Sequence, residues 1–556
     1  MSLHIQLGSR RIAIAADQRP TLAQLLETAG LHLNLRCGGE GVCGGCRVQL
    51  GAGTFRSDGL TLTLATGAQH DAFACQTHVL SVDAEISVPA GSLLETGGQI
   101  VSDFHAPHHL ASAAAPPTSA TAPLAAAVDI GTTTVALVLL DPATGRILAR
   151  ASQYNQQIRK ADDIASRISF CRTEQEVRVM QELVIQQTIN PLLAEACATA
   201  GVPTDRVQRL AAAGNTVMEH LFLGLPVESI GRLPFHAVRH IHPPCEASAL
   251  GLAMQPCGRV DVVPSVAGYI GGDITADIHA AHLTTRGGES VLVDVGTNSE
   301  IVYALDGRLL ACATAAGPAF EGAGLLHGRR ASPGATEHVR CDAKLDFQCD
   351  VIGGGKADGI CGSGIIDFLA VGFRCGLINA HGRFDIERLK NSGRHVISPL
   401  ARGSSHACVL VPANASANGQ AVVVTERDIE QVLKAKAATY AGLKTLLTLQ
   451  GRTVRDIPRF VLAGGFARHI DIANAIALGL LPDLPLDRFE VLGNGSLAGA
   501  YLALTDATAL PAMEHISRLP QAIELNRTQD FEDNFIDALL IPNLNTEEFP
   551  SVRSAT

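Results

Sequence analysis

The sequence of 556 residues contains no tryptophan, and aromatic residues make up only 4% of it. It also lacks a long run of lysine and arginine, and its formal net charge at pH 7 is −11. Charge-driven binding to nucleic acid or to an anionic membrane needs a basic surface, so we expect neither as a partner. No uncharged apolar stretch reaches the roughly 18 residues of a membrane span, and the N-terminal MSLHIQLGSR has no apolar signal region.

Charged residues are few, at 17%, but 47% hydrophobic residues are enough to fill several cores. At about 100–200 residues per domain, the length predicts three or four domains. Most of the 14 cysteines are scattered along the chain, which is typical of a reducing compartment and not of a disulfide framework. We therefore expect a cytoplasmic protein.

Four cysteines predict an iron–sulfur site. Cys37, Cys43 and Cys46 lie in the glycine-rich stretch LRCGGEGVCGGCRVQL, and Cys75 follows in FACQT. Four thiolates complete a [2Fe–2S] cluster without any other ligand. Glycines allow the loop to wrap around the cluster with its N–H groups turned inward. A structural zinc site usually shows two C-x2-C pairs, whereas this stretch has one, so we favour the cluster.

Residues 1–94 around these cysteines are predicted to form one small domain. HIQLG and RIAIAA alternate around Gly8–Ser9 as in a hairpin, and Thr21 can cap a helix that ends at Gly30. RVQL and LSVDAEISV are further predicted strands. The pattern resembles [2Fe–2S] ferredoxin domains of the plant type, although its first cysteine interval is C-x5-C instead of C-x4-C. That resemblance, not the periodicity, implies a β-grasp fold.

A segment rich in Ala, Pro, Ser and Thr follows and is predicted to be a flexible linker. Its histidines His105, His108 and His109 could bind a metal, but exposed linker side chains are the simpler interpretation. A subdivision of the next domain near residue 205 is left open. The predicted division of the chain is a ferredoxin-like domain (1–94), the linker (95–125), a first lobe (126–285), a second lobe (286–543) and a tail (544–556).

The two lobes are predicted from an internal repeat. AAAVDIGTTTVALVLLDPATGRILARA begins at Ala125, and SVLVDVGTNSEIVYALDGRLLACA begins at Ser290, so that Asp129 aligns with Asp294. Each copy reads as an apolar strand, an Asp-x-Gly-Thr turn and two further strands. Two such copies predict two similar half-domains that face each other.

Each turn is a predicted phosphate cradle, because backbone N–H groups and hydroxyls of such a turn can point at a phosphate. Asp129 and Asp294 cannot bind a bare phosphate, but they can hold Mg²⁺ or its waters. Two facing cradles would bind the β- and γ-phosphates of ATP from both sides. The predicted donors are Gly131, Thr132 and Thr133 in the first turn and Gly296, Thr297 and Asn298 in the second.

The twin turns resemble the phosphate-1 and phosphate-2 motifs of the acetate and sugar kinase, Hsp70 and actin superfamily. The adenosine motif of that superfamily is matched by RFVLAGGF, where a strand at 459–463 leads into Gly464, Gly465 and Phe466. Paired glycines there let the backbone lie against the nucleotide. The resemblance implies a duplicated, RNase H-like, two-lobed ATPase fold, so we expect a multidomain α+β and α/β protein. Thr425 and Asp428 form a capping-box pattern that opens a long predicted helix.

Asp273 is, with Asp129 and Asp294, a candidate catalytic residue. It lies in YIGGDITADIHAAHL (269–283), which, like AAAGNTVMEHLFLGLP (211–226), is predicted to be a strand, a turn and a helix. In sugar kinases of the superfamily the catalytic Asp opens a helix shortly before the phosphate-2 strand, and Asp273 stands there. The alternative, that Asp273 only caps its helix, stays open.

Three other residues lie in glycine-rich turns. Glu321, in GPAFEGAG, and Ser363, in GICGSGIID, are left open between lining the cleft and shaping their turns. Cys361 is interpreted as a buried thiol and not as a fifth cluster ligand.

The order of all these motifs resembles the reductive activators of corrinoid proteins over nearly the whole chain. The motifs after the ferredoxin domain are DIGTTT, GNTVMEH, GGDIT, DVGTNSE, GPAFEGAG, GICGSG, LAGGF and FEDNFIDALLIPN. The resemblance implies an ATP-hydrolysing enzyme whose [2Fe–2S] cluster donates one electron to an inactive Co(II) corrinoid protein of a methyltransferase system, restoring Co(I). It also implies ATP and Mg²⁺ as cofactors and an upstream electron donor, and a homodimer is compatible with the sequence.

Two other functions fit parts of the sequence. A small-molecule kinase with a redox-sensing ferredoxin domain would use Asp273 as a base near the γ-phosphate. An ATP-driven clamp would use the nucleotide only to hold a partner, as chaperones do. The four cysteines favour electron transfer, because neither alternative needs a cluster.

Overall fold

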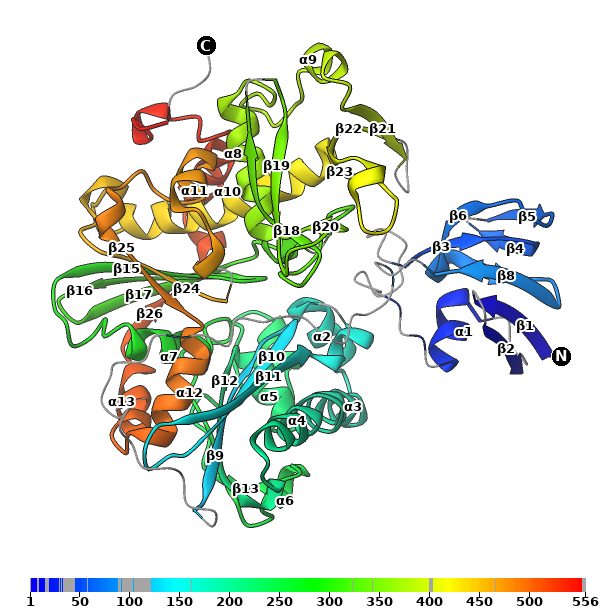
Figure 1. Cartoon of the computed structure of the whole chain (residues 1–556). Coiled ribbons are helices and arrows are strands. Elements are labelled where there is room, and N and C mark those ends of the chain that lie inside the picture. Colours follow the sequence, from blue (N-terminus) through cyan, green and yellow to red (C-terminus); the bar gives the residue numbers. More distant parts are fainter. Residues whose placement is uncertain are drawn as a thin grey trace.

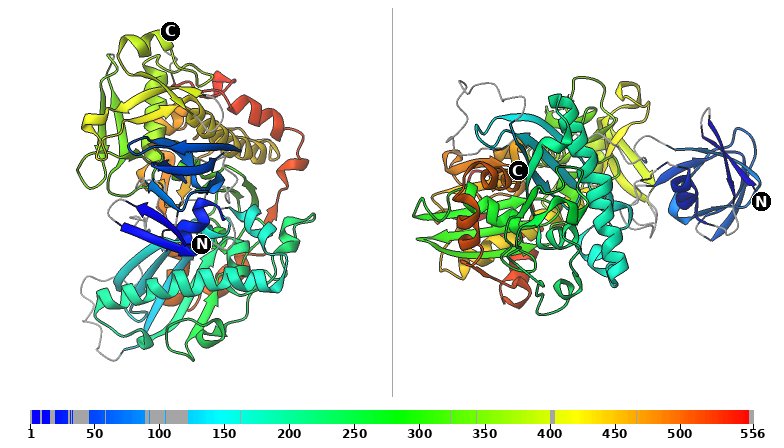
Figure 2. Two further views of the ribbon diagram at one scale, coloured as in Figure 1. Left: turned by 90° about the vertical axis from the view of Figure 1, so that its right-hand side faces the viewer. Right: turned by 90° about the horizontal axis from the view of Figure 1, so that it is seen from below.

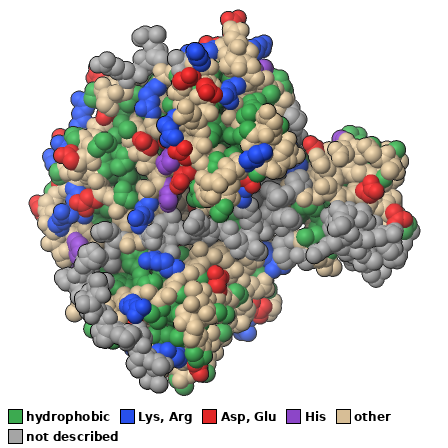
Figure 3. All heavy atoms as spheres, in the orientation of Figure 1, with side chains coloured by type: hydrophobic (Ala, Val, Ile, Leu, Met, Phe, Trp, Pro, Cys, Tyr) green, Lys and Arg blue, Asp and Glu red, His purple; other side chains and the backbone are tan. Residues whose placement is uncertain are grey.

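The computed structural model shows a small N-terminal unit that projects from a larger two-lobed body (Figures 1, 2 and 3). No helix among the described residues is both long and apolar enough to cross a membrane. The residues that the structure describes are 2–7, 10–15, 20–29, 31, 33, 46–57, 59–88, 92, 104, 122–161, 163–322, 324–342, 344–399, 404–465 and 467–552.

The N-terminal unit is built on a five-stranded sheet with the order β2-β1-β8-β3-β6, next to a three-stranded sheet with the order β5-β4-β7. Its helix α1 (Leu22–Thr28) begins as predicted, because the Thr21 hydroxyl accepts a hydrogen bond from the Gln24 N–H. The predicted Gly8–Ser9 turn and the Gly30 stop lie outside the described residues. The strands are β1 (Ser2–Leu7), β2 (Arg10–Ala15), β3 (Arg47–Leu50), β4 (Gly53–Ser57), β5 (Leu60–Leu64), β6 (His70–Phe73), β7 (Thr77–Val79) and β8 (Asp83–Ser87).

The two lobes contain sheets with the same five-stranded core, and the sixth strand of each sheet lies at a different edge. The first has the order β11-β10-β9-β12-β14-β13 and the second β25-β24-β15-β16-β17-β26. In the first sheet β9 pairs antiparallel with β10 and parallel with β12, and in the second β15 pairs in the same way with β16 and β24. The internal repeat is therefore a duplicated structure, and the predicted fold class is confirmed.

The first lobe confirms one predicted strand–turn–helix and corrects the other. Residues 211–226 contribute to β12 and α5, as expected. The strand predicted at the start of 269–283 is wrong, because the chain leaves the sheet after β14 and Ile270 only bridges back to Ala267. The elements are β9 (Leu124–Ile130), β10 (Thr134–Leu140), β11 (Ile147–Tyr154), α2 (Ile164–Phe170), α3 (Glu174–Val184), α4 (Asn190–Ala200), β12 (Val207–Gly214), α5 (Thr216–Phe222), β13 (Cys245–Glu246), α6 (Ala247–Leu250), β14 (Arg259–Val262) and α7 (Gly272–Ala280).

The second lobe adds two small sheets and the long helix α10 to its main sheet. The predicted capping box is present, since Thr425 and Asp428 exchange hydrogen bonds at the start of α10. The elements are β15 (Glu289–Val295), β16 (Ser299–Leu305), β17 (Arg308–Thr314), β18 (Ala335–Cys341), β19 (Phe347–Val351), β20 (Gly359–Ile360), α8 (Gly362–Arg374), α9 (Ile386–Asn391), β21 (His395–Pro399), β22 (Ser404–Val411), β23 (Val422–Thr425), α10 (Glu426–Thr448), β24 (Phe460–Ala463), α11 (Ile472–Leu478), β25 (Phe489–Gly493), α12 (Gly495–Thr505), α13 (Ala509–Ile516), β26 (Pro520–Ala522) and α14 (Phe531–Ala538).

The helices α7 and α12 join the lobes and share one hydrophobic core with both main sheets (Figure 1). They approach closely, because a Cβ at Gly499 of α12 would lie 2.7 Å from the Ala276 Cα of α7. At the C-terminal end of α12, the Arg209 side chain of β12 donates to the carbonyls of Ala503 and Leu504. This helix pair fixes the base of the cleft into which both Asp-x-Gly-Thr turns open.

Candidate iron–sulfur and nucleotide sites

Two of the four predicted cluster ligands lie against each other in the N-terminal unit. The Cys46 and Cys75 sulfurs are 3.3 Å apart, although the residues are 29 positions apart in the sequence. Both thiols are buried, and neither is in a disulfide. The Ala74 N–H donates to the Cys46 carbonyl (2.9 Å), which holds the two backbone segments together. Two sulfurs at this separation can bind the same iron atom, so this pair fits a [2Fe–2S] cluster.

The other two predicted ligands, Cys37 and Cys43, lie outside the described residues. Within the described part of the chain, no three His, Cys, Asp or Glu side chains converge in a way that could hold a metal ion. The Cys46–Cys75 pair is therefore half of the predicted ligand set.

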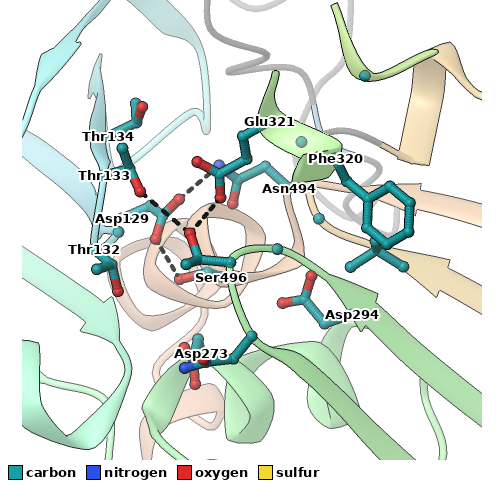
Figure 4. A pocket seen from close by; sticks show the side chains of 18 of the residues that line it. Asp129, Thr132, Thr133, Thr134, Asp273, Asp294, Phe320, Glu321, Asn494 and Ser496 are labelled. Carbon is teal, nitrogen blue, oxygen red and sulfur yellow. Dashed lines mark hydrogen bonds between the residues drawn. The ribbon is translucent and has the colours of Figure 1, made fainter. Parts of the chain in front are cut away.

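One pocket between the lobes brings the predicted nucleotide residues together (Figure 4). They reach it from the ends of β9, β15 and β24 and from the start of α7. Phe466 lies outside the described residues. The predicted residues that line the pocket are Asp129, Gly131, Thr132, Thr133, Asp273, Asp294, Gly296, Thr297, Asn298, Gly464 and Gly465.

The first turn is held in shape from the side away from the pocket. A Cβ at Gly131 would collide with the Thr134 carbonyl, so the turn requires glycine. The Asn155 amide donates to the Gly131 carbonyl (3.0 Å), and the buried Arg167 guanidinium donates to the Thr132 carbonyl. Neither Asn155 nor Arg167 lines the pocket. With its carbonyls bound elsewhere, the turn can present its N–H groups to a phosphate.

The second turn touches the first. The Thr133 and Thr297 hydroxyls are 3.2 Å apart, and the Thr297 hydroxyl donates to the Glu321 carboxylate (2.6 Å). Dashed lines from Thr133 and Glu321 mark these two contacts in Figure 4. Arg330, from the second lobe, donates to the Thr134 hydroxyl of the first lobe (2.7 Å). Its guanidinium carbon also lies 3.9 Å from the centre of the Tyr154 ring. The two turns are thus joined beside the pocket by polar contacts between the lobes.

The paired aspartates of the repeat have matching electrostatics. Asp129 accepts hydrogen bonds from the Asn494 amide (2.8 Å) and the Ser496 hydroxyl (2.9 Å). Burial raises the pKa of Asp129 to about 6, and burial also raises the pKa of Asp294 to about 6. Burial disfavours the charged form of a carboxyl group, and a cation bound beside the group stabilises that charged form.

Asp273 lines the pocket and does not cap its helix. The N-cap of α7 is Gly271, and among the described residues the Asp273 carboxylate accepts a hydrogen bond from the adjacent Ile274 N–H (2.8 Å) and from no other group. The capping alternative is therefore wrong. Burial, followed by the charges of Asp294 and Glu219, raises the pKa of Asp273 well above its usual value. Such a perturbed carboxyl in a cleft is a candidate for proton transfer.

Several residues of the cleft were not predicted. Glu300 lines it, and burial together with the Asp273 and Asp294 charges raises its pKa well above the usual value. A charge at the start of the otherwise apolar SEIVYAL could have indicated it. Asn494 and Ser496, which donate to Asp129, lie in VLGNGSLAG. Its pattern of strand, glycine turn and helix could have indicated a further turn at the cleft. Arg330 had no sequence signal, since its loop carries no motif.

The residues left open in glycine-rich turns both line the pocket. Glu321 and Ser363 are lining residues, and Cys361 lies beside Ser363. The Cys361 thiol is buried and lies 3.3 Å from the Thr336 carbonyl, in a different unit from the Cys46–Cys75 pair. This placement agrees with its interpretation as a buried thiol.

Gly464→Val is expected to weaken ATP binding about tenfold or more. Gly464 has a φ of +93°, and a Cβ there would lie 2.5 Å from an Asp294 carboxylate oxygen and 2.7 Å from the Val295 carbonyl. Strain of about 1–3 kcal/mol at such a position corresponds to roughly fivefold to 150-fold in affinity, and to about thirtyfold at the middle of that range. Nucleotide titration by calorimetry measures the effect, while the visible absorption of the cluster should not change.

Gly355→Val is the matched control, because a Cβ at Gly355 meets nothing within 4 Å and its φ is not positive. Equal ATP affinities of the two variants would contradict the role assigned to Gly464.

Comparison with known proteins covers nearly the whole chain. A model of the 2Fe-2S iron-sulfur cluster binding domain matches residues 5–80, the RACo middle region matches 124–286, and the C-terminal domain of RACo, the ASKHA domain, matches 289–553. A solved structure described as "Reductive activator for corrinoid,iron-sulfur protein" superimposes with a TM-score of 0.73 at 30% identity, covering 99% of this chain and 100% of that one.

Two curated relatives carry related descriptions. The corrinoid activation enzyme RamQ of Eubacterium limosum is 31% identical over 417 residues, which are 74% of this chain and 69% of the relative. The [Co(II) methylated amine-specific corrinoid protein] reductase of Methanosarcina barkeri is 24% identical over 422 residues, 70% of this chain and 72% of the relative. With its cluster-binding domain and its two-lobed nucleotide cleft, the chain belongs to the family of the reductive activators of corrinoid proteins.

Proposed function

We propose that this protein is an ATP-dependent reductive activator that transfers one electron to a Co(II) corrinoid protein of a methyltransferase system. The observation that carries the proposal is that one chain holds both a thiol pair suited to an iron–sulfur cluster and a cleft with two facing phosphate turns. The printed descriptions of the relatives, which name corrinoid activation and a corrinoid protein reductase, support the same partner. When bound, a [2Fe–2S] cluster supplies single electrons.

ATP is needed because the reduction is uphill. Moving one electron against a potential difference of 100 mV costs about 2.3 kcal/mol. The nucleotide can supply this only if it binds more tightly to one arrangement of the complex than to another. The contacts of Thr133 with Thr297 and of Arg330 with Thr134 join the lobes beside the pocket, so their separation by a nucleotide would change how the lobes face each other.

Mg²⁺ is the proposed companion of ATP. Asp129 and Asp294 are its proposed holders, acting through bound waters, because Mg²⁺ usually keeps several waters and takes one or two protein carboxylates. Asp273 is the proposed base that orients and deprotonates the attacking water.

A contact between the N-terminal unit and the first lobe connects the nucleotide cleft with the N-terminal unit. Glu27 of α1 pairs with Arg159 of the first lobe (3.3 Å). Arg159 ends a short turn that begins after Asn155, whose amide binds the Gly131 carbonyl of the first phosphate turn. A partly exposed ion pair contributes at most about 1 kcal/mol, so it can guide the N-terminal unit without fixing it.

The remaining assignments are proposals of the same kind. We propose a cytoplasmic protein, with an upstream electron donor, without nucleic acid or membrane as a partner, and with a homodimer compatible with these features. The proposed division is a ferredoxin-like domain at 1–94, a linker at 95–125, lobes at 126–285 and 286–543, and a tail at 544–556. The described cysteines outside the cluster pair are all free, which agrees with a reducing compartment.

The test is corrinoid reduction by wild type and by Cys46→Ser, each with and without ATP. Co(I) is expected to accumulate only with wild type, ATP and a reductant together, and the Co(II) corrinoid protein should stimulate ATP hydrolysis. Cys257→Ser, which changes an exposed cysteine, is the control and should behave as wild type. If Cys46→Ser reduces the corrinoid as well as wild type does, the proposal is wrong. A kinase would instead need a small phosphoryl acceptor, and its turnover would not respond to the loss of the cluster.

A further inference from the structure

A pair of thiols lies in the second lobe, at the far end of β18 and α8 from the nucleotide pocket. The two elements start together. The Cys361 N–H donates to the Thr336 carbonyl (3.0 Å), and the Ser363 hydroxyl donates to the Glu337 carbonyl (2.9 Å). Further along, the Val339 N–H donates to the Asp367 carboxylate (3.3 Å). These contacts show that β18 and α8 run side by side in the same direction.

The spacing along the two elements brings Cys341 and Cys375 to the same level. A Cβ at Gly364 would touch the Thr336 carbonyl, which fixes the starting point. From Thr336 to Cys341 the strand rises about 3.3 Å per residue, or about 16 Å in all. From Gly364 to Cys375 the helix rises about 1.5 Å per residue, again about 16 Å. Both thiols are half-buried and pack on the same hydrophobic core.

The Cys341 thiol lies 3.2 Å from the Asp342 carbonyl and the Cys375 thiol 3.5 Å from the Gly372 carbonyl. Each thiol also shifts the pKa of the other. A hydrogen bond from Cys341 lowers the pKa of the Cys375 thiol to about 6, aided by backbone N–H groups and by Arg388, while the same contact raises the pKa of Cys341. The thiolate is the reactive form of cysteine, so a lowered pKa favours Cys375 over Cys341 as the attacking thiol. The neighbouring thiols differ. Burial raises the pKa of Cys349 to about 11 and that of Cys408 to about 12.

We propose that Cys341 and Cys375 form a redox-sensitive dithiol, which closes to a disulfide and ties the last residue of β18 to the end of α8. The Cys375 thiolate attacks a sulfur of a small disulfide such as oxidised glutathione and releases one glutathione thiolate. Cys341 then gives up its proton and attacks the Cys375 sulfur, releasing the second glutathione. The protein loses two electrons and two protons, and one glutathione disulfide becomes two thiols.

This modification site is separate from the cluster cysteines but linked to the cleft. Cys361, Gly362 and Ser363, which open α8, line the nucleotide pocket. The dithiol lies at the other end of the same strand and helix. Oxidation would then act on this protein at the dithiol of the second lobe as well as at the iron–sulfur cluster.

The experiment uses the full-length protein with its cluster, treated without oxygen with oxidised glutathione at about pH 7.5, then alkylated and digested with trypsin. Trypsin places each thiol in its own peptide: CDAK for Cys341, CGLINAHGR for Cys375, LDFQCDVIGGGK for Cys349 and GSSHACVLVPANASANGQAVVVTER for Cys408. The expected product is CDAK linked to CGLINAHGR, which dithiothreitol separates. Cys349→Ser, on the neighbouring strand β19, should still give this product, and Cys341→Ser should not.

A second measurement does not depend on disulfide formation. The alkylation rate of Cys375 is expected to rise with pH around a midpoint near 6 in wild type. In Cys341→Ala the midpoint should move upward, because the hydrogen-bond donor is lost. The proposal is overturned if Cys341 and Cys375 both stay alkylatable when the exposed Cys257 is already glutathionylated. It is also overturned if Cys375 links to Cys408 instead, or if Cys341→Ala leaves the midpoint unchanged.

Discussion

Asp273→Asn is expected to lower ATP hydrolysis by about 10²–10⁴-fold, the usual contribution of a positioned acid or base. ATP binding should change little, because a group that acts on the water matters more in the transition state than in the ground state. Corrinoid activation should be lost together with hydrolysis. Steady-state ATPase assays and nucleotide titration on the same preparation separate the two effects. Asp205→Asn, an exposed aspartate of the first lobe, is the control for a change of one charge.

The same variant should not be less stable than wild type. Burial and neighbouring charges raise the pKa of Asp273 in the folded protein. A raised carboxyl pKa means that its contribution to stability is present below the unfolded pKa and is lost as pH rises toward the folded pKa. Asparagine does not titrate, so the variant does not have this loss. The melting temperature of nucleotide-free Asp273→Asn minus that of wild type should therefore increase from pH 5 to pH 8, as measured by scanning calorimetry. Wild-type hydrolysis by Asp273→Asn would contradict the catalytic assignment.

The features that the sequence predicted well depend on local chemistry. The Asp-x-Gly-Thr turns were recognisable because a tight turn between two apolar strands needs Gly131, and because the whole unit occurs twice. The start of α10 was recognisable because the side chains of Thr425 and Asp428 each accept a hydrogen bond from the backbone N–H of the other, within one helical turn. Such features are decided by residues that are neighbours in the chain, so no knowledge of the fold is needed to find them.

The features that were missed depend on contacts between distant segments. Asn494 binds Asp129 across 365 positions of sequence, and Arg330 binds Thr134 across 196. The apolar Tyr269–Ile270 pattern predicted a strand, but β14 had already taken the position beside β12, so the chain turns back there. Likewise, only the folded chain shows that β18 and α8 run side by side, with Cys341 and Cys375 at the same end. Periodicity cannot show which apolar segment enters a sheet or which thiols become neighbours.

Cys75→Ser is expected to remove most of the iron from the purified protein. Wild type should be brown, with [2Fe–2S] spectra and about two irons per chain. Cys75 is the distant member of the ligand set, yet its sulfur lies 3.3 Å from that of Cys46, and both side chains are buried in the same core. A serine hydroxyl is a much poorer iron ligand than a thiolate, and burial leaves no room for another side chain to replace it. Cys37→Ser, Cys43→Ser and Cys46→Ser should each lower the iron content as well.

The loss should be confined to the cluster. No described residue of the N-terminal unit lines the nucleotide pocket, so the ATP affinity of Cys75→Ser should equal that of wild type. Cys361→Ser is the sharper control. This buried thiol lies in the pocket wall, so its replacement should leave the iron content unchanged even if ATP binding shifts. Iron analysis, visible absorption and electron paramagnetic resonance of the reduced protein measure the result. Full iron occupancy in Cys75→Ser would mean that the fourth ligand is another residue, and the meeting of Cys46 with Cys75 would then be ordinary core packing.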